Sequence, residues 1–391
     1  MKILHTADWH TGRTLHGINR TPEIREVLQE IIEIAKTEAV DLVLVAGDIY
    51  DKRNPPADAE AAVYEFFLEL AKAKIPSVVI AGNHDSPDRL DAVASLLKLS
   101  NVTVIGQPKL SKQGGVFDLN IANQRVRIAA LPFVSERRIV KVAELLNEDM
   151  GAWLEKYQTG MRKLVNNLTR GFSDEQINLL MMHTTMNGSA LANSEYQFHC
   201  TETYSLSSDI FPTETNYVAL GHIHKAQPIL DYPPSAAHYS GSVLQLDFGE
   251  QSSAKYVYIA TVEAAKPTEL KEIKLSAGKS LKNIKANLDS LEHKEFEISD
   301  FDGWVKLKLE LEHPQPGLKD RIKRNHANIL VIETEIANYQ SEQQRQSIDL
   351  EKMSLFEAYQ AYYNEKHGKK IPANIATAFK ELYQADFEGK L

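Results

Sequence analysis

Histidine and acidic residues gather in four short clusters of the sequence, and one more histidine, His183, follows an apolar run of its own. The clusters are residues 8–10, 47–51, 82–85 and 221–224. Together with His183, these clusters supply seven candidate metal ligands, namely Asp8, His10, Asp48, Asn83, His183, His222 and His224. Imidazole and carboxylate donors with an amide oxygen, and no thiolate, suit divalent ions such as Mn²⁺, Fe²⁺ or Zn²⁺. The residue types therefore predict a metal centre.

The number of candidate ligands favours two ions over one. Seven ligands exceed what a single tetrahedral ion needs, and they are about right for two ions that share one carboxylate. Two metal ions roughly 3.5–4 Å apart clamp a phosphate and lower the pKa of a bridging water, which then acts as a hydroxide nucleophile at neutral pH. The predicted chemistry is metal-assisted hydrolysis of a phosphoester.

Each cluster by itself has an ordinary explanation. A single histidine at a strand end is commonly a hydrogen-bonded surface residue. Asp8 and Asp48 would also serve as helix N-caps, and Gly47-Asp48 alone is typical of a turn. The Gly-His-x-His match at 221–224 is the least accidental, because 19 glycines and 13 histidines in 391 residues give about 0.02 chance matches. The order and placement of all the clusters together favour a shared site.

The clusters stand at the ends of predicted strands. The first half of the chain alternates short apolar β-rich runs with helical patterns such as Thr21–Ala39, which is typical of an α/β domain. The predicted strands are Lys2–Thr6, Leu42–Ala46, Ser77–Ala81, Val102–Ile105, Val126–Leu131, Ile177–Met182, Tyr217–Leu220, Ala237–Ser240 and Lys255–Thr261. The carboxyl ends of strands line the ligand crevice in open α/β sheets, so clusters on separate strands can converge there.

A shift in composition near Ala264–Pro267 places the end of the first domain at residue 265. The spacing of apolar residues over Ser280–Leu291 predicts a helix. Trp304–Glu312 alternates strictly between apolar and polar residues, which predicts a strand; a basic helix and a second strand, Ile329–Glu333, follow. Residues 266–342 are therefore expected to form a small α+β domain.

The segment 348–391 is expected to form a helical hairpin. Ser354 and Glu357 make a capping box for its first helix, which should end at Gly368, and a second helix should begin near Pro372. Its apolar stripe consists of Leu355, Phe356, Tyr359, Phe379 and Leu382. Two short amphipathic helices have little core of their own, so this stripe either packs back on its own domain or docks on a partner in the helix-in-groove mode.

The overall composition limits the kinds of partner. The 44 basic and 53 acidic residues give a formal net charge of −9, which argues against a protein that holds nucleic acid by bulk charge alone. The single cysteine, Cys200, excludes an internal disulfide framework and fits a reducing cytoplasm. No apolar h-region follows the N-terminus and no apolar run reaches 18 residues. A soluble cytoplasmic protein with no membrane association is expected.

These motifs resemble those of the calcineurin-like metallophosphoesterase superfamily. The matching motifs are Asp8-x-His10, Gly47-Asp48, Gly82-Asn83-His84-Asp85, His183 and Gly221-His222-x-His224. The opening MKILHTADWHTG, the phrase Val45–Asp51, and Tyr239–Ser242 followed by Asp247–Glu250 narrow the resemblance to the SbcD-type nuclease subunits of bacteria, relatives of the Mre-type nucleases. The resemblance implies an α/β fold, a four-layer α/β/β/α sandwich over residues 1–265. A small DNA-binding α+β capping domain and the C-terminal helical hairpin complete it.

The resemblance also implies a role for each site residue. One metal ion would be held by Asp8, His10, Asp48 and His224. Asp48 would bridge to a second ion, held by Asn83, His183 and His222. His84 would stabilise the transition state or protonate the leaving oxygen, and Asp85 would orient His84. Archaeal and eukaryotic relatives carry histidine where this chain has Asp51, which leaves the role of Asp51 open.

The activity and partners implied by the resemblance are those of a Mn²⁺-dependent DNA nuclease that trims duplex ends 3′→5′ and opens hairpins endonucleolytically. A homodimer is implied, with the terminal hairpin docking on the coiled coil of an ABC-type ATPase subunit to give a heterotetramer. The basic residues near the metal motifs, expected to contact DNA phosphates, are Arg13, Lys52, Arg53 and Arg89. A solvated loop would carry such charges in any case.

Three other functions compete with this one. A phosphoesterase for small diesters such as cyclic nucleotides would use the same ligands, but it has no need of the segments beyond residue 265. A protein phosphatase fits less well, because its usual Gly-Asp-x-x-Asp-Arg-Gly reads Gly-Asp-Ile-Tyr-Asp-Lys-Arg at residues 47–53. A non-catalytic scaffold would be expected to have lost ligands, and none is missing.

Overall fold

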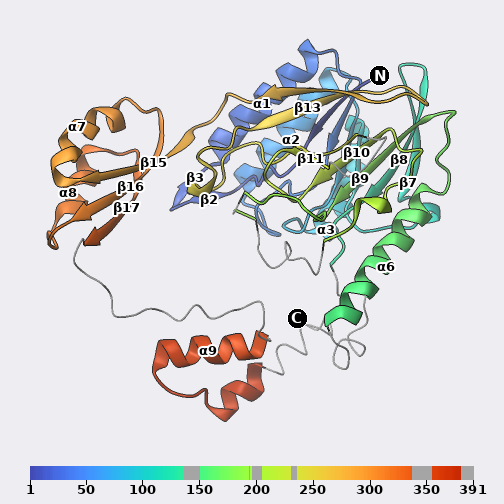
Figure 1. The fold of residues 1–391 in the computed structure, drawn as a ribbon. Coiled ribbons are helices and arrows are strands. Elements are labelled where there is room, and N and C mark those ends of the chain that lie inside the picture. The colour runs from blue at the N-terminus through green and yellow to red at the C-terminus, as the bar shows by residue number, and fades with distance from the viewer. Residues whose placement is uncertain (136–149, 193, 196–204, 230–235, 337–354, 380–391) are drawn as a thin grey trace.

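The computed structural model, shown in Figure 1, describes residues 1–135, 150–192, 194–195, 205–229, 236–336 and 355–379. Cys200, Ser354 and Leu382 lie outside these ranges. Figure 1 shows a large body that holds two β-sheets and a small domain to one side of it. Among the described helices, none is long and apolar enough to cross a membrane.

The first sheet contains six strands. In spatial order they are β14 (Glu269–Lys274), β13 (Tyr256–Thr261), β1 (Lys2–Thr6), β4 (Leu42–Val45), β5 (Ser77–Ile80) and β6 (Val102–Ile105). Strands β1, β4, β5 and β6 pair in parallel. Strand β13 pairs antiparallel with β1, and β14 pairs antiparallel with β13. Parallel strands that are covered on both faces have continuous apolar sequences, and β4, with the sequence LVLV, is an example.

The second sheet also has six strands. In order they are β11 (Gln227–Pro228), β12 (Ala236–Tyr239), β10 (Tyr217–Gly221), β9 (Ile177–His183), β8 (Gln124–Leu131) and β7 (Val116–Ile121). The four central strands are parallel. All nine predicted strands are present, with ends that differ by a residue or two, and β7, β11 and β14 were not predicted.

The large body is a four-layer α/β/β/α sandwich, so the fold class is confirmed. Ile3 and Leu42 of the first sheet pack on Leu179 and Ala219 of the second in one buried cluster. The outer face of the first sheet packs on α1 (Thr21–Thr37) and α2 (Ala57–Lys72), with α3 (Pro87–Leu97) beside them. The second sheet packs on α6 (Met150–Thr169). Alternate side chains of each strand thus point toward the other sheet and toward the covering helices.

Short elements complete the body. A two-stranded hairpin joins β2 (Thr14–Leu15) to β3 (Ile18–Asn19). The 3₁₀ turns are η1 (Lys98–Ser100), η2 (Ser111–Gln113), η5 (Ser208–Ile210) and η6 (Phe248–Glu250). Asp247 caps η6, since its Oδ1 accepts a hydrogen bond from the Gly249 amide at 3.1 Å.

The small domain is a parallel sheet of β15 (Ser280–Asn287), β16 (Gly303–Leu311) and β17 (Ile329–Ile336). Two helices, α7 (Leu288–Ser299) and α8 (Leu318–Asn325), connect the strands. The predicted strands and basic helix are present. The helix predicted over Ser280–Leu291 is wrong, because residues 280–287 pair with β16 and only Leu288 onward is helical.

One strand of the first sheet lies beyond the domain boundary predicted at residue 265. Strand β14 lies beyond residue 265 and pairs with β13 along its whole length, so it completes the first sheet. The terminal segment begins with α9 (Leu355–His367), and residues 373–379 form a second helical stretch. The capping residue expected for α9, Ser354, lies outside the described residues.

Candidate metal centre

The ends of β1, β4 and β5 in one sheet meet the ends of β9 and β10 in the other. Each strand ends at or is followed by residues of the predicted ligand set, and all seven predicted ligands lie at this junction. The six histidine and aspartate ligands are buried, with at most 3% of any residue exposed. Residues from distant parts of the chain are therefore brought to one point, as their placement at strand ends predicts.

The first group of ligands is Asp8, His10 and His224, whose donor atoms all lie within 4.8 Å of one another. The Nε2 atoms of His10 and His224 are 3.1 Å apart. The carboxylate of Asp8 is held in place by the backbone amide of His222, which donates to its Oδ1 at 2.9 Å. Two imidazole nitrogens and a carboxylate thus face a common point.

The second group is Asp48, His183 and His222, and Asn83 belongs with it. The Oδ1 atom of Asn83 lies 3.0 Å from His183 Nε2 and 2.8 Å from His222 Nδ1. His183 Nδ1 donates to the carbonyl oxygen of Ala46 at 2.8 Å, so Nε2 is the nitrogen that faces Asn83 and Asp48 and that a metal ion would bind in place of its proton. The ring of His183 is therefore oriented to ligate.

Asp48 lies between the two groups. Its Oδ2 is 3.6 Å from His10 Nε2 and 3.3 Å from His183 Nε2. Its Oδ1 accepts a hydrogen bond from the His84 amide at 2.8 Å. A carboxylate with ring nitrogens of both groups near one oxygen has the position that a bridging ligand requires.

Two glycines let the strand ends approach each other this closely. A Cβ on Gly47 would lie 2.3 Å from His183 Nδ1, and a Cβ on Gly82 would lie 2.1 Å from Asp48 Oδ1. Several of the ligands themselves have positive φ angles, 52° at Asp8, 48° at His10, 50° at Asp48 and 101° at His222. Backbone conformations of this kind are costly and concentrate at functional sites.

The electrostatics of the site call for positive charge. Burial lowers the pKa of His10 to about 4, so its ring is neutral near pH 7 and keeps a lone pair. Burial also acts to lower the pKa of His183, but the facing Asp48 outweighs it and raises that pKa to about 9. Burial raises the pKa of Asp8 to about 7. The buried carboxylates need cationic partners, and a metal ion would supply that charge in place of the proton on His183. Imidazole nitrogens with an amide oxygen complete a donor set that fits divalent ions.

His84 stands beside the ligands with a different set of contacts. Its Nδ1 lies 2.9 Å from the carbonyl oxygen of Asp51 and donates to it. Its ring meets that of His10 edge-on, with centroids 4.7 Å apart, and His84 is half-buried. Within the described part of the chain Nε2 makes no hydrogen bond, so that atom is free to exchange a proton with a substrate.

Asp85 does not orient His84, contrary to expectation. Its carboxylate accepts three backbone hydrogen bonds, from Gly82 at 2.8 Å, Tyr50 at 3.0 Å and Ile49 at 3.2 Å. Burial, with Asp48 nearby, raises its pKa to about 6. Asp85 therefore ties the loop after β5 to the loop after β4, and the Asp51 carbonyl orients His84 instead.

The side chain of Asp51 has a place of its own in the site. Its Oδ1 lies 3.4 Å from His10 Nδ1 and accepts a hydrogen bond from Arg13 at 3.0 Å. Burial acts to raise its pKa, but His10 and Arg13 outweigh burial and hold that pKa at about 2. Asp51 thus lies behind a ligand histidine, the usual place of a carboxylate that supports a metal-bound ring.

Sequence reasoning missed two residues on the far side of His224. Ser194 Oγ lies 2.6 Å from His224 Nδ1, and the Ser194 hydroxyl donates to the carboxylate of Glu250. Burial acts to raise the pKa of Glu250, but His224 and Lys255 hold it at about 2. Glu250 belongs to the motif Asp247–Glu250, which supported the family resemblance but implied no function for Glu250. Nothing in the sequence marks Ser194 as a site residue.

The basic residues expected to contact DNA fall into two pairs. Arg13 is bonded to Asp51, and Arg89 pairs with Glu60 at 2.7 Å. Lys52 and Arg53 are exposed and form no ion pair within the described part of the chain. Arg53 and Arg89 line a cavity of about 180 Å³ that also includes Tyr50 and Tyr64.

Part of the terminal apolar stripe packs within the hairpin. The Tyr359 and Phe379 rings stack with centroids 4.5 Å apart, and Phe356 lies 5.8 Å from Phe379. Leu355 begins α9, and Leu382 lies outside the described residues. The aromatic members of the stripe thus join the two helical stretches to each other.

Comparison with known proteins agrees with this geometry. A family described as calcineurin-like phosphoesterase matches residues 1–226, and one described as type 5 capsule protein repressor C-terminal domain matches residues 267–367. The chain is similar to the SbcD subunit of the SbcCD nuclease of Bacillus subtilis (strain 168), with 31% identity over 390 residues, which cover 98% of this chain and 97% of the relative.

Two solved structures are more distant. A dimetal phosphatase from Danio rerio has a TM-score of 0.46 and 13% identity, covering 71% of this chain and 96% of its own. A protein of Thermus thermophilus has a TM-score of 0.37 and 12% identity, covering 69% of this chain and 98% of its own. The family match and the full-length relative make the expected enzyme class, a metal-dependent phosphodiesterase, the class of this protein. The chain belongs to the calcineurin-like phosphoesterase family, in the branch that contains the SbcD components of SbcCD nucleases.

Proposed function

We propose that this protein is a DNA nuclease subunit with a centre for two Mn²⁺ ions. The observation that carries the proposal is the position of Asp48, whose carboxylate lies between His10 of one buried ligand group and His183 of the other. Each group draws its residues from both sheets. The full-length relative is named as a nuclease subunit. The expected activities are 3′→5′ trimming of duplex ends and endonucleolytic opening of hairpins.

The ligands divide between the ions as the groups divide in space. One ion would be held by Asp8, His10, Asp48 and His224, and the other by Asp48, Asn83, His183 and His222. Nitrogen and oxygen donors without sulfur suit Mn²⁺. His84 is left out of both sets, because the Asp51 carbonyl fixes its Nδ1.

The reaction is divided between the ions and the chain. When bound, the two ions supply charge that holds the phosphodiester and a hydroxide nucleophile. His84, with Nδ1–H bonded to Asp51, presents Nε2 to the substrate side. In its doubly protonated form it gives the Nε2 proton to the leaving oxygen and is left as the neutral imidazole, still bonded through Nδ1. Asp51 and Asp85 keep the loops after β4 and β5 in place during this transfer.

DNA is expected to cross the surface beside His84. Lys52 and Arg53 form no ion pair with the residues that the structure describes, and each would contact a backbone phosphate. Arg13 and Arg89 are paired with carboxylates, so each would have to exchange that partner for a phosphate. The net charge of −9 predicts weak binding without help, which fits a nuclease that acts with a second subunit.

The partner proposed is the coiled coil of an ABC-type ATPase, bound by the terminal hairpin over residues 348–391. The relative is named as one of the subunits of SbcCD, which supports a complex of more than one kind of chain. Stacking of Tyr359 on Phe379 makes the hairpin a preformed unit that can dock as a whole. The domains would then be residues 1–274, a capping domain over 280–342, and the hairpin.

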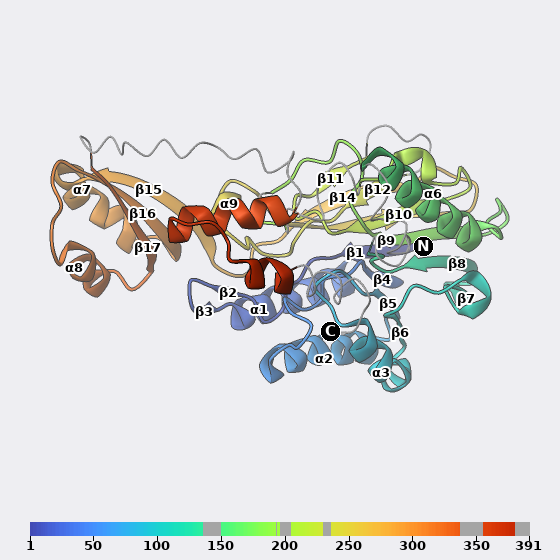
Figure 2. The same ribbon diagram turned by 90° about the horizontal axis from the view of Figure 1, so that it is seen from below.

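A homodimer is proposed on a second surface. The large apolar side chains that are exposed on α2, α3 and η1 are Leu68, Leu96 and Leu99, which are 50%, 67% and 83% exposed. Figure 2 shows α2 and α3 together on the same side of the body. Pairing of two copies across these helices would give a heterotetramer with two ATPase subunits. A cytoplasmic location follows from a DNA substrate and agrees with the single cysteine.

A panel of substrates tests the proposed function. Purified protein with Mn²⁺ is incubated with duplex DNA, a DNA hairpin and a cyclic nucleotide, alone and with the ATPase subunit. We expect cleavage of both DNAs and little turnover of the cyclic nucleotide, with His84→Ala inactive on all three. Rapid turnover of the cyclic nucleotide with both DNAs intact, even beside the ATPase, would refute the nuclease assignment.

A further inference from the structure

The side of His224 that faces away from the metal centre is held by a buried polar chain. His224 Nδ1 lies 2.6 Å from Ser194 Oγ, and the Ser194 hydroxyl donates to Glu250 Oε1. The other carboxylate oxygen of Glu250, Oε2, accepts a hydrogen bond from the Lys255 ammonium at 2.5 Å. Glu250 is 2% exposed and Lys255 is 7% exposed. A carboxylate and an ammonium buried together this completely need a function or a compensating network.

The direction of the hydrogen bonds follows from Glu250. A carboxylate can only accept, so the Ser194 hydroxyl must give its proton to Glu250 and its oxygen must accept from His224 Nδ1–H. A neutral imidazole carries one proton, so Nε2 is left with the lone pair. Nε2 is the atom that lies 3.1 Å from His10 Nε2 in the centre.

We propose that Glu250, acting through Ser194, is a positioning residue that fixes the tautomer and ring orientation of His224 for metal binding. This inference rests on the proposed metal centre. Neutral Ser194 alone would not do this, because a hydroxyl can donate to Nδ1 as readily as it accepts from it, and donation would place the ring proton on Nε2. The charge on Glu250 removes that freedom.

Lys255 compensates the buried charge of Glu250 without reaching the metal centre. Its ammonium donates to Ser242 Oγ at 2.7 Å and to the backbone carbonyl of His224 at 3.2 Å. Lys255 therefore contacts both ends of the hydrogen-bonded series, the Glu250 carboxylate at one end and the backbone of His224 at the other. The ring of His183 is oriented by a single contact instead, because the carbonyl oxygen of Ala46 accepts a hydrogen bond from its Nδ1.

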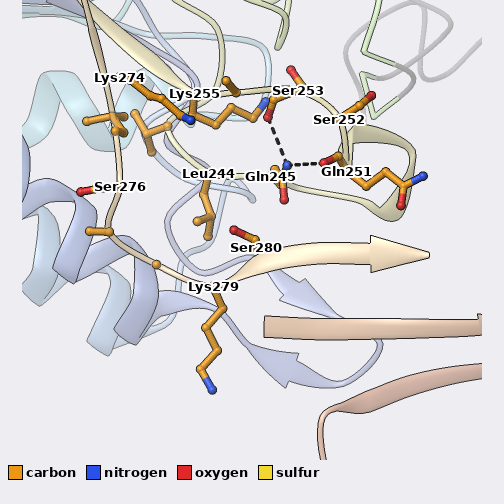
Figure 3. A pocket seen from close by; sticks show the side chains of 15 residues that line it. Leu244, Gln245, Gln251, Ser252, Ser253, Lys255, Lys274, Ser276, Lys279 and Ser280 are labelled. Carbon is orange, nitrogen blue, oxygen red and sulfur yellow. Dashed lines mark hydrogen bonds between the residues drawn. The ribbon is translucent and has the colours of Figure 1, made fainter. Parts of the chain in front are cut away.

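The turn that carries Glu250 is fastened to the capping domain. Gln245 donates to the Glu250 carbonyl at 3.0 Å and accepts from the Leu281 amide of β15 at 2.7 Å. Asn283 of β15 donates to the Phe248 carbonyl at 3.1 Å. Gln245 and Lys255 line a cavity of about 290 Å³, formed by residues 243–245, 251–255 and 274–280. Figure 3 shows Gln245 in its wall, bonded to Gln251 and Ser253. The chain from Glu250 to His224 is thus supported from both domains.

Mn²⁺ binding to the intact protein, followed by titration calorimetry, tests the inference. Glu250→Gln and Ser194→Ala should each weaken the site that contains His224 by about 10- to 100-fold, the usual cost of losing a group that orients a metal-bound histidine. Ser194→Thr, which keeps the hydroxyl, should stay near wild type. Asp247→Asn, in the same turn and still able to cap it, serves as the matched control.

The tautomer itself gives a readout that needs no metal. In protein labelled with ¹⁵N-histidine, the His224 ring should show a protonated Nδ1 in wild type and a mixed or inverted tautomer in Glu250→Gln, with melting temperatures confirming that each variant is folded. Folded Glu250→Gln with wild-type Mn²⁺ affinity and an unchanged tautomer would overturn the inference. Wild-type protein that binds no Mn²⁺ would instead refute the metal centre on which it rests.

Discussion

His10 and His224 come from opposite sheets, and their Nε2 atoms lie 3.1 Å apart. His10 follows β1 and His224 follows β10, so a metal ion held between these atoms would link the two halves of the sandwich. Binding to the folded state alone stabilises a protein by mass action. The metal is therefore expected to act on stability as well as on catalysis.

Addition of Mn²⁺ to metal-free protein should raise the melting temperature. At about 100 times the dissociation constant the gain is about 2.7 kcal/mol, which corresponds to roughly 3 °C for a chain of this size. Scanning calorimetry with and without EDTA measures the shift. His224→Ala should show a clearly smaller shift, and equal shifts in the two proteins would contradict the placement of His224 in the centre.

Gly82→Ala should inactivate the enzyme without unfolding it. The added Cβ would lie 2.1 Å from Asp48 Oδ1, so the bridging carboxylate must move, and a displacement of about 1 Å at a catalytic centre costs on the order of 100-fold in rate. Rates with Mn²⁺ on a small chromogenic diester report the loss. Gly171→Ala, whose Cβ would meet only the tip of the Arg127 side chain, is the matched control and should keep its activity.

His84→Ala should separate proton transfer from metal binding. Because the Asp51 carbonyl fixes Nδ1 and His84 belongs to neither proposed ligand set, kcat should fall by about 10²- to 10⁴-fold while Mn²⁺ affinity stays at the wild-type value. Steady-state kinetics and calorimetry on the same preparations give both numbers. A parallel loss of Mn²⁺ affinity would make His84 a ligand, as its closeness to His10 and Asp48 allows.

Stability should fall as the pH is lowered below about 6.5. Burial lowers the pKa of His5 to about 3 and that of His238 to about 4, from 6.5 in the unfolded chain. Between these values the unfolded state binds protons that the folded state does not, so each histidine removes about 1.4 kcal/mol per pH unit. Urea unfolding at pH 7.0 and 5.0 measures this slope. His5→Gln should reduce the slope, whereas the exposed His16, changed to Gln, should leave it unchanged.

The sequence was sufficient for the features that depend on local pattern. Apolar runs such as LVLV at Leu42–Val45 predict buried parallel strands, and ligands placed directly after strands must meet when the strands share an edge. The parallel strands and the convergence of the candidate ligands could be predicted for this reason, whereas the four layers were implied by the family resemblance. The resemblance supplied how the ligands divide between two ions, which the residue types alone leave open.

Features that depend on distant pairing could not be predicted. Leu281, Ile284 and Leu288 have helical spacing, but pairing of residues 280–287 with β16 overrides it. Asp85 follows His84 in sequence, yet its carboxylate points to backbone amides of another loop. Ser194 and Glu250 are 56 residues apart, and only the folded chain joins them.

Metal stoichiometry tests the central claim, a two-metal centre bridged by Asp48, most directly. Wild-type protein, dialysed against Mn²⁺ and analysed by elemental mass spectrometry together with calorimetry, should bind two ions per chain. Asp48→Asn keeps the size of the side chain but removes the charge between His10 and His183, and it should bind at most one ion, weakly, with activity lost. One ion in the wild-type protein, or two in Asp48→Asn with unchanged affinity, would contradict the account.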